Sequence, residues 1–350
     1  MKANSWVTVV AVALACILSV ASVQQVNAQS KVGTTSAQFL GIGVGPKAMS
    51  MGGAYVSFDQ DVSSIYWNPG AIAMVGKTEA AFSYTNWLVG TKFEWFGGML
   101  TLDNSSTLGL SFTNLNYGSE EVTTVESPDG TGAQWSAADM AIALTYSRML
   151  TDRFSIGGSV KYINQSIWNE SASTFGLDLG LIFITGFHGM RIGMSISNFG
   201  GDMQLSGKDL LQRVDIDPTN SGGNKTLVGN LKTDSWPIPL FFRVGLGLDV
   251  VQSDLVDVTL ATDAVRPSDN TQFVCLGTQI GVEKIFFIRG GYKLYIKGEG
   301  VPNIDQQEGL SLGVGVRLAV PGAGTVEANY ASTNFGVFGN INTLSLGFGF

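Results

Sequence analysis

The feature that most constrains this chain is a two-residue alternation of apolar with small or polar side chains. Residues 342–350 read N-T-L-S-L-G-F-G-F, so every second side chain is apolar. Successive side chains of a β-strand point to opposite faces, and the pattern therefore predicts a strand with one apolar face. Because the same alternation recurs at 137–148 and 309–320, we expect an all-β fold built from many such strands.

The alternation is found in fourteen segments, and most of them have about the length of a tilted strand that crosses a bilayer. The predicted strands are 79–85, 92–102, 107–117, 137–148, 154–164, 174–184, 189–199, 239–250, 254–263, 273–283, 285–296, 309–320, 324–331 and 341–350. Long connections, at 118–136, 200–238 and 297–308, follow only odd-numbered strands. A bacterial barrel with both termini in the periplasm has this parity, so we expect a transmembrane antiparallel β-barrel of about 14 strands over residues 79–350.

The composition agrees with this prediction. The chain has 45 Gly, only 14% charged residues and a mean hydropathy of +0.21. Beyond the N-terminus it has no second apolar run of the roughly 18 residues that a membrane helix needs. With 20 basic and 28 acidic residues, it lacks the clustered positive charge that nucleic-acid binding requires, so no nucleic-acid partner is expected.

A soluble secreted β-sandwich or barrel is the alternative, since it would alternate as well. Its polar face would be rich in Lys and Glu, whereas here the less apolar face is mostly Gly, Ala, Ser and Thr with isolated charges. Each basic residue would cost about 2–4 kcal/mol at mid-membrane on a lipid-facing surface, so we expect these charges in the lumen, as structural pairs or pore-lining groups. The predicted lumen charges are Lys161, Asp178, Arg191, Arg243, Asp249, Asp257, Asp263, Arg289, Lys293, Arg317 and Glu327.

Aromatic residues near the predicted strand ends are typical of the girdles that barrels place at the two membrane interfaces. The predicted girdle residues are Trp95, Tyr117, Tyr146, Tyr162, Phe242, Tyr292 and Tyr330.

The N-terminus has the features of a secretory signal. Lys2 precedes an apolar stretch from Trp6 to Val20, and Val26-Asn27-Ala28 offers small residues for cleavage. We therefore expect residues 1–28 to be removed on export to the outer membrane of a Gram-negative-type bacterium. Lipoprotein processing at Cys16 is an alternative. With cleavage after Ala28, Cys275 is the only thiol of the mature chain, so no internal disulfide can form.

Residues 29–78 lack sustained alternation and are interrupted by Gly and Pro, yet they are too apolar for a disordered tail. We interpret them as a folded plug, or hatch. Within them, F-L-G-I-G-V-G-P-K-A-M-S-M-G-G-A-Y-V at 39–56 and D-V-S-S-I-Y-W-N-P-G at 61–70 resemble the N-terminal signature of the PorV/PorQ family. That family belongs to the barrels that are shaped like the long-chain fatty-acid transporter FadL.

The resemblance implies a FadL-like barrel of fourteen strands whose lumen is closed by an N-terminal hatch. The family's Asn-Pro-Ala hatch motif corresponds to Asn68, Pro69 and Gly70, directly after Trp67. Gly in place of Ala is expected to loosen the backbone at this point. The C-terminal Phe350, with Phe348, resembles the aromatic signal that the barrel-assembly machinery reads.

The resemblance also implies a non-enzymatic role in a type IX-like secretion pathway, in which such a barrel handles secreted proteins. The expected partners are outer-membrane lipid, the barrel-assembly machinery, a secretion translocon and its cargo. The alternative function is FadL-like transport of hydrophobic small molecules, such as long-chain fatty acids, through an apolar channel beside the hatch.

No motif in the chain predicts catalysis, a cofactor or a metal. Gly309-Leu-Ser311-Leu-Gly313 has the letters of a nucleophile elbow, but it lies in an alternating strand, and the single His188 falls in a predicted periplasmic turn. Gly41-Ile-Gly43-Val-Gly45 has no surrounding βαβ unit that would make it a dinucleotide loop. One His and one mature Cys are too few for a transition-metal cluster.

Overall fold

The computed structural model describes residues 33–58, 61–187, 189–215, 219, 227–296, 308–322 and 324–350. The predicted signal at 1–28 and the predicted turn position of His188 lie outside the described residues. Among the described residues, no helix is both long enough and apolar enough to cross a membrane.

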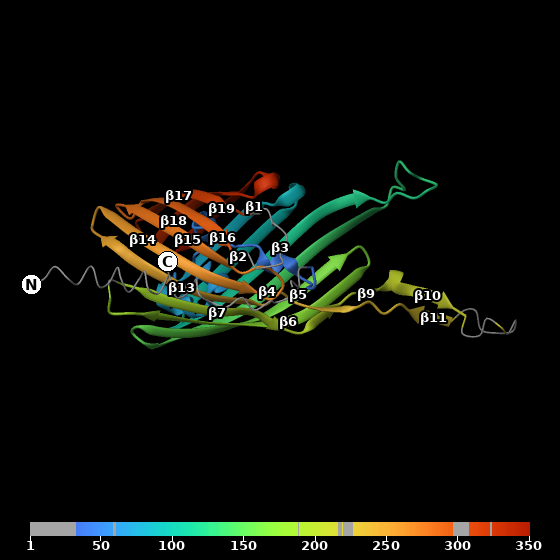
Figure 1. The fold of residues 1–350 in the computed structure, drawn as a ribbon, viewed down its shortest axis with the longest axis horizontal. Coiled ribbons are helices and arrows are strands. Elements are labelled where there is room, and N and C mark those ends of the chain that lie inside the picture. The colour runs from blue at the N-terminus through green and yellow to red at the C-terminus, as the bar shows by residue number, and fades with distance from the viewer. Residues whose placement is uncertain are drawn as a thin grey trace, which may run out of the picture.

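Fourteen antiparallel strands of the described chain form one closed sheet, which confirms the predicted fold class (Figure 1). In chain order they are β1 (Glu79–Asn86), β2 (Lys92–Thr101), β3 (Ser106–Glu121), β4 (Gln134–Thr151), β5 (Phe154–Ile167), β6 (Glu170–Ile184), β7 (Arg191–Gly200), β13 (Phe241–Gln252), β14 (Val256–Pro267), β15 (Phe273–Val282), β16 (Phe286–Tyr295), β17 (Leu310–Val320), β18 (Gly324–Asn334) and β19 (Asn340–Gly349). The barrel closes where β1 pairs with β19, and β7 pairs with β13 across the longest connection.

Two neighbouring strands extend much further than the sequence predicted. β3 and β4 have 16 and 18 residues, so both ends of the predicted loop 118–136, residues 118–121 and 134–136, are strand. Figure 1 shows this hairpin projecting beyond the end of the barrel. Residues 117–121 are exposed on both faces, and the alternation that reveals a membrane strand is therefore absent there.

The connection between β7 and β13 contains its own small elements. They are β8 (Asp202–Gln204), β9 (Ser206–Gly207), η4 (Lys208–Leu210), β10 (Leu211–Val214), β11 (Leu227–Asn230) and β12 (Ser235–Pro237). β8 pairs with β12, and β9 adds a short pairing to β6. β10 and β11 form a hairpin that projects furthest from the barrel, on the same side as the β3–β4 extension (Figure 1).

The outer face of the barrel carries exposed apolar residues, as a lipid-facing wall requires. Five of the predicted girdle residues are exposed on it: Tyr146, Tyr162, Phe242, Tyr292 and Tyr330. Tyr117 has the parity of the inward-facing residues of β3, and its hydroxyl donates to the buried Asp139 carboxylate at 2.7 Å. The prediction for Trp95 is wrong, because this side chain is only 2% exposed and points into the barrel beside Phe93. Apolar residues of β2 occupy both faces, so its periodicity alone does not distinguish lipid from lumen.

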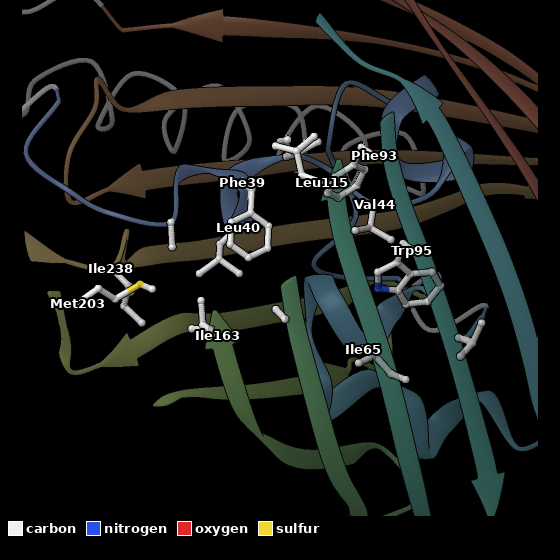
Figure 2. Close-up of a cluster of buried hydrophobic side chains, with 14 of the residues drawn as sticks. Phe39, Leu40, Val44, Ile65, Phe93, Trp95, Leu115, Ile163, Met203 and Ile238 are labelled. Carbon is white, nitrogen blue, oxygen red and sulfur yellow. The ribbon is translucent and has the colours of Figure 1, made fainter. Parts of the chain in front are cut away.

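Short helices of the N-terminal segment, which we define as described residues 33–58 and 61–78, lie inside the barrel. They are η1 (Gln38–Gly41), α2 (Pro46–Ser50), α3 (Ser64–Trp67), η2 (Pro69–Ala71) and α4 (Ile72–Val75). Figure 2 shows Phe39, Leu40, Val44 and Ile65 among inward-facing wall residues such as Trp95. The main hydrophobic core is therefore the contact between this segment and the inner wall. Two further short helices, η3 (Leu88–Gly90) and η5 (Gly336–Phe338), lie in connections between strands.

Candidate functional site

The candidate functional site is the barrel interior, where the N-terminal segment meets the wall. The predicted hatch residue Asn68 is fully buried at the C-terminal end of α3. Its Nδ2 donates to the backbone carbonyls of Val56 at 2.7 Å and Leu181 at 2.8 Å, and its Oδ1 accepts from the Gly70 amide at 3.0 Å. One side chain therefore ties two parts of the N-terminal segment to β6.

Gly70 approaches the wall more closely than any residue with a side chain could. A Cβ at this position would lie 2.6 Å from the Gly180 carbonyl oxygen and 2.9 Å from the Leu181 Cα. Its own carbonyl accepts hydrogen bonds from the hydroxyls of Ser147 at 2.9 Å and Ser155 at 2.7 Å. The expectation that Gly70 loosens the motif is wrong, because here glycine permits a close backbone contact that fixes the segment against β4, β5 and β6.

Trp67, the first residue of the predicted motif, is 6% exposed. Its indole nitrogen donates to the Val44 carbonyl at 2.9 Å, which satisfies the polar end of a buried ring. Its ring packs edge-on against Tyr66, and the Arg243 guanidinium of β13 lies 5.6 Å from its centroid. Trp67 thus links the N-terminal segment to β13, which only β7 separates from the β6 contact of Asn68.

A buried ion network holds α2 against β18. Lys47 Nζ lies 2.7 Å from Asp61 and 2.9 Å from Glu327, and all three residues are at most 6% exposed. The Tyr55 hydroxyl and Ser63 also donate hydrogen bonds to the Asp61 carboxylate. This network thus joins Lys47 and Asp61 of the N-terminal segment to Glu327 of the wall by ion pairs.

The titration of the two network residues that lie outside the spanning strands follows from this pairing. Burial alone would lower the pKa of Lys47, but the carboxylates of Asp61 and Glu327 outweigh it and the pKa is raised. Burial would raise the pKa of Asp61, but the charge and hydrogen bond of Lys47 hold it well below its usual range. Both groups are therefore ionised in the neutral range.

Lys47 and Asp61 were not among the residues selected from the sequence. The signal available for them was a charged residue inside an apolar, glycine-rich stretch. Such a residue must find a partner if the stretch is buried. The sequence cannot show that the partner, Glu327, comes from the far end of the chain.

Most of the predicted lumen charges are brought together in pairs. Lys161 lies 2.6 Å from Asp178, Arg191 lies 2.8 Å from Asp249, and Arg317 lies 2.9 Å from Glu327. Two further predicted lumen charges also form ion pairs, Arg289 with Glu327 at 4.0 Å and Lys293 with Glu308.

Three predicted lumen residues take part in no ion pair within the described part of the chain. Asp263 accepts hydrogen bonds from the backbone amides of Tyr55 at 2.7 Å and Val56 at 2.8 Å. Asp257 is half-buried near the start of β14. Arg243 is 4% exposed and lies against three aromatic rings. Asp263 thus stabilises the N-terminal segment, and the charge of Arg243 on the neighbouring strand acts on it without forming an ion pair.

A cavity of about 360 Å³ remains between the N-terminal segment and the wall formed by β13 to β17. Residues of the β1–β2 and β18–β19 connections, including Trp87 and Phe335, also line it. Those connections follow the first and thirteenth strands, so the cavity lies toward the end of the barrel that carries the long loops.

The described residues include no group of three or more His, Cys, Asp or Glu side chains arranged to hold a metal ion. Ser311 is buried in β17, where the alternation had predicted it, and does not lie on a strand-to-helix turn. The C-terminal Phe350 is 74% exposed, and its amide donates to the Thr78 carbonyl at 2.8 Å, while Phe348 faces outward from β19.

The closed sheet, its apolar outer wall and its charged, filled interior define an outer-membrane β-barrel of FadL-like architecture. Residues 25–220 match the family model described as Type IX secretion system protein PorV, and the chain belongs to this family. A comparison with curated protein sequences gave no match.

Solved structures show the same fold at low sequence identity. The CymD monoaromatic hydrocarbon channel is 12% identical, with 88% of this chain and 96% of that chain covered and a TM-score of 0.56. A FadL homologue of Pseudomonas aeruginosa is 13% identical, with 92% and 99% covered and a TM-score of 0.53. The toluene transporter TbuX of Ralstonia pickettii is 11% identical, with 88% and 97% covered and a TM-score of 0.53. At these identities the likeness concerns the fold alone.

Proposed function

We propose that the protein handles exported proteins in a type IX secretion pathway, as a plugged outer-membrane barrel without catalytic activity. The match of residues 25–220 to the PorV family is the observation that carries this proposal. A signal within residues 1–28 would direct the chain to export, and the barrel-assembly machinery would insert it into outer-membrane lipid.

The interior supports the role of a fixed plug for the N-terminal segment. The Lys47 network and the Asn68 hydrogen bonds attach that segment to widely separated strands of the wall. Removing it would break several buried ion pairs and hydrogen bonds at once, which is costly in an interior of low dielectric. A barrel filled in this way conducts no protein through its lumen, so we assign the contact with partners to its loop end.

The loop end has the surface for such contacts. Apolar side chains on its projecting elements are exposed, with Val228 at 63%, Leu231 at 56% and Trp236 at 44%. The β10–β11 hairpin that carries Val228, and that Leu231 directly follows, projects away from the lipid-facing wall, so lipid does not account for these two residues (Figure 1). Exposed apolar groups in water are typical of protein interaction sites. We expect a secretion translocon or its cargo to cover them.

Gene deletion and complementation in the source bacterium test this role. We expect deletion to leave type IX cargo in the periplasm, and the wild-type gene to restore its appearance at the cell surface. The double variant Val228→Asp, Leu231→Asp should restore much less cargo at the cell surface, while the amount of this variant in the outer membrane stays normal. Val125→Asp is the matched control, because Val125 is 96% exposed on the other projecting hairpin. Unchanged secretion in the deletion strain would contradict the proposal.

A second candidate function is the passage of hydrophobic small molecules. The cavity beside the N-terminal segment favours it, together with the fold shared with a hydrocarbon channel and a toluene transporter. Entry of labelled toluene into cells with and without the protein distinguishes the two functions. A secretion barrel predicts equal rates, whereas a faster rate with the protein would favour transport.

A further inference from the structure

Eight aromatic residues are among those that line the interior cavity of about 360 Å³. They come from the N-terminal segment, from the wall and from two loops, and include Tyr66, Trp67, Trp87, Phe241, Phe273 and Tyr295. The volume lies in the range of roughly 300–1,000 Å³ that is usual for small-molecule sites. Aromatic side chains of this kind suit a ligand with a flat apolar part. The polar groups of the cavity then determine which functional group the ligand must carry.

Arg243 is the cation of this cavity that forms no ion pair within the described residues, although its charge acts on Asp263 of the neighbouring strand β14. Its guanidinium lies 4.7 Å from the ring centroid of Phe241, 5.6 Å from Trp67 and 5.7 Å from Tyr66. One hydrogen bond is formed, from Nη1 to the Ser197 hydroxyl at 3.0 Å. The rings hold the guanidinium in place without neutralising it, so its other N–H groups remain available to an acceptor.

The other cations on the inner wall differ from Arg243 in this respect. Lys161, Arg191, Arg289, Lys293 and Arg317 each have a carboxylate within 4.0 Å, and across the described residues no carboxylate lies that close to Arg243. A buried charge without a counter-ion in direct contact is costly relative to water. A bound anion would remove this cost at Arg243 and at none of the paired positions.

The remaining charged residues of the cavity are already engaged. Lys293 pairs with Glu308, and the Asp269 carboxylate accepts hydrogen bonds from the side chains of Thr35 and Gln38. The Ser311 hydroxyl also lines the cavity, is buried, and has no hydrogen-bond partner among the described residues. Arg243, which forms one hydrogen bond, and the Ser311 hydroxyl, which forms none among the described residues, thus line the same cavity.

We propose that this cavity binds an aromatic carboxylate, with the ring among the aromatic side chains and the carboxylate on Arg243. A guanidinium can bind a carboxylate through two parallel hydrogen bonds, and the Ser311 hydroxyl supplies a further donor on the wall. A neutral hydrocarbon would fill the cavity but leave both groups unsatisfied. The site depends on neither candidate function, because it needs only the cavity and its two polar groups.

Calorimetric titration tests the proposal on the full mature barrel in lipid nanodiscs. The probe is 3-phenylpropanoate, and its neutral analogue 3-phenylpropanamide has nearly the same size and shape. We expect the acid to bind at least about tenfold more tightly than the amide, since the charged hydrogen bond adds more than a neutral one. This comparison uses the wild-type protein and therefore does not depend on the folding of a variant.

Arg243→Gln should abolish the preference for the acid while retaining weak binding of the amide. Arg191→Gln is the matched control, because Arg191 also lies over an aromatic ring, that of Phe58, but pairs with Asp249 and does not line the cavity. It should keep the preference. Equal binding of acid and amide to the wild type, no binding of either, or tighter binding of decanoate than of 3-phenylpropanoate would each overturn the proposal.

Discussion

The Asn68 side-chain amide donates a hydrogen bond to the backbone carbonyl of Leu181, 113 positions further along the chain, at 2.8 Å. The bond crosses from the N-terminal segment to β6 inside the barrel. Asn68 is fully buried and makes two further hydrogen bonds within its own segment. The position of the segment in the lumen therefore depends in part on one amide.

Asn68→Ala should loosen the N-terminal segment without preventing barrel insertion. The change leaves the carbonyls of Val56 and Leu181 and the amide of Gly70 without their partner, at about 1–3 kcal/mol for each unsatisfied group. We expect faster cleavage of residues 33–78 by added protease and an unchanged heat-shifted mobility of the barrel. Asn104→Ala, in an exposed turn, is the control. Identical cleavage rates for Asn68→Ala and the wild type would show that the amide does not hold the segment.

Gly70→Ala should destabilise the same contact by a different mechanism. A Cβ at this position would lie 2.6 Å from the Gly180 carbonyl oxygen, so the backbone must shift. Overpacking of this kind costs about 1–3 kcal/mol, and we expect the urea midpoint of unfolding to fall accordingly. Gly98→Ala is the matched control in another strand, where a Cβ would meet nothing within 4 Å. A midpoint as high as that of Gly98→Ala would contradict the close approach.

Lys47→Met should be among the most destabilising single changes in the segment. It removes the cation that neutralises the buried carboxylates of Asp61 and Glu327. Breaking a buried pair from one side costs about 3–5 kcal/mol, because a charge is left uncompensated. The measurement is the free energy of unfolding, with the exposed Lys92→Met as control. The double variant Lys47→Met, Glu327→Gln should recover part of the loss, and failure to do so would count against a charge-based mechanism.

The Lys47–Asp61 pair should stabilise the segment over a broad pH range. The pKa of Asp61 is lowered, so its contribution is complete above the usual value of 3.8 and is lost only as the pH falls through the lower folded value. The pKa of Lys47 is raised, so its contribution is complete below 10.5 and is lost as the pH rises further. We expect hydrogen exchange at residues 44–50, corrected for its intrinsic pH dependence, to show constant protection from about pH 5 to 9. If half of the protection were lost near neutral pH, a group other than this pair would control the protection of these residues.

Removal of Phe350 should impair assembly more than stability. Its side chain is 74% exposed, so its loss removes little packing from the folded barrel. We expect less heat-modifiable protein in the outer membrane but a nearly unchanged unfolding midpoint for the fraction that does insert. Phe199→Ala, at a side chain 65% exposed, controls for the loss of a surface aromatic. Wild-type levels of the truncated barrel in the outer membrane would argue against an assembly signal.

The sequence was sufficient to predict the barrel because strand periodicity is a local property. Each of the fourteen alternating segments overlaps one strand of the closed sheet, since a wall between lipid and lumen requires opposite chemistry on its two faces. The prediction was wrong where that requirement does not hold. Residues 117–121 project into water on both faces, and Trp95 is an inward-facing aromatic residue on a strand with two apolar faces.

The sequence alone thus determined the fold class, the approximate strands and the family signature around Asn68, because these depend on neighbouring residues. Only the tertiary structure decided which distant groups meet. The pairing of Lys47 with Glu327, the backbone contact of Gly70 with Gly180, and the position of Arg243 over three aromatic rings all arise when the sheet closes around the N-terminal segment. Closure brings together residues more than a hundred positions apart, and no local pattern specifies those distances.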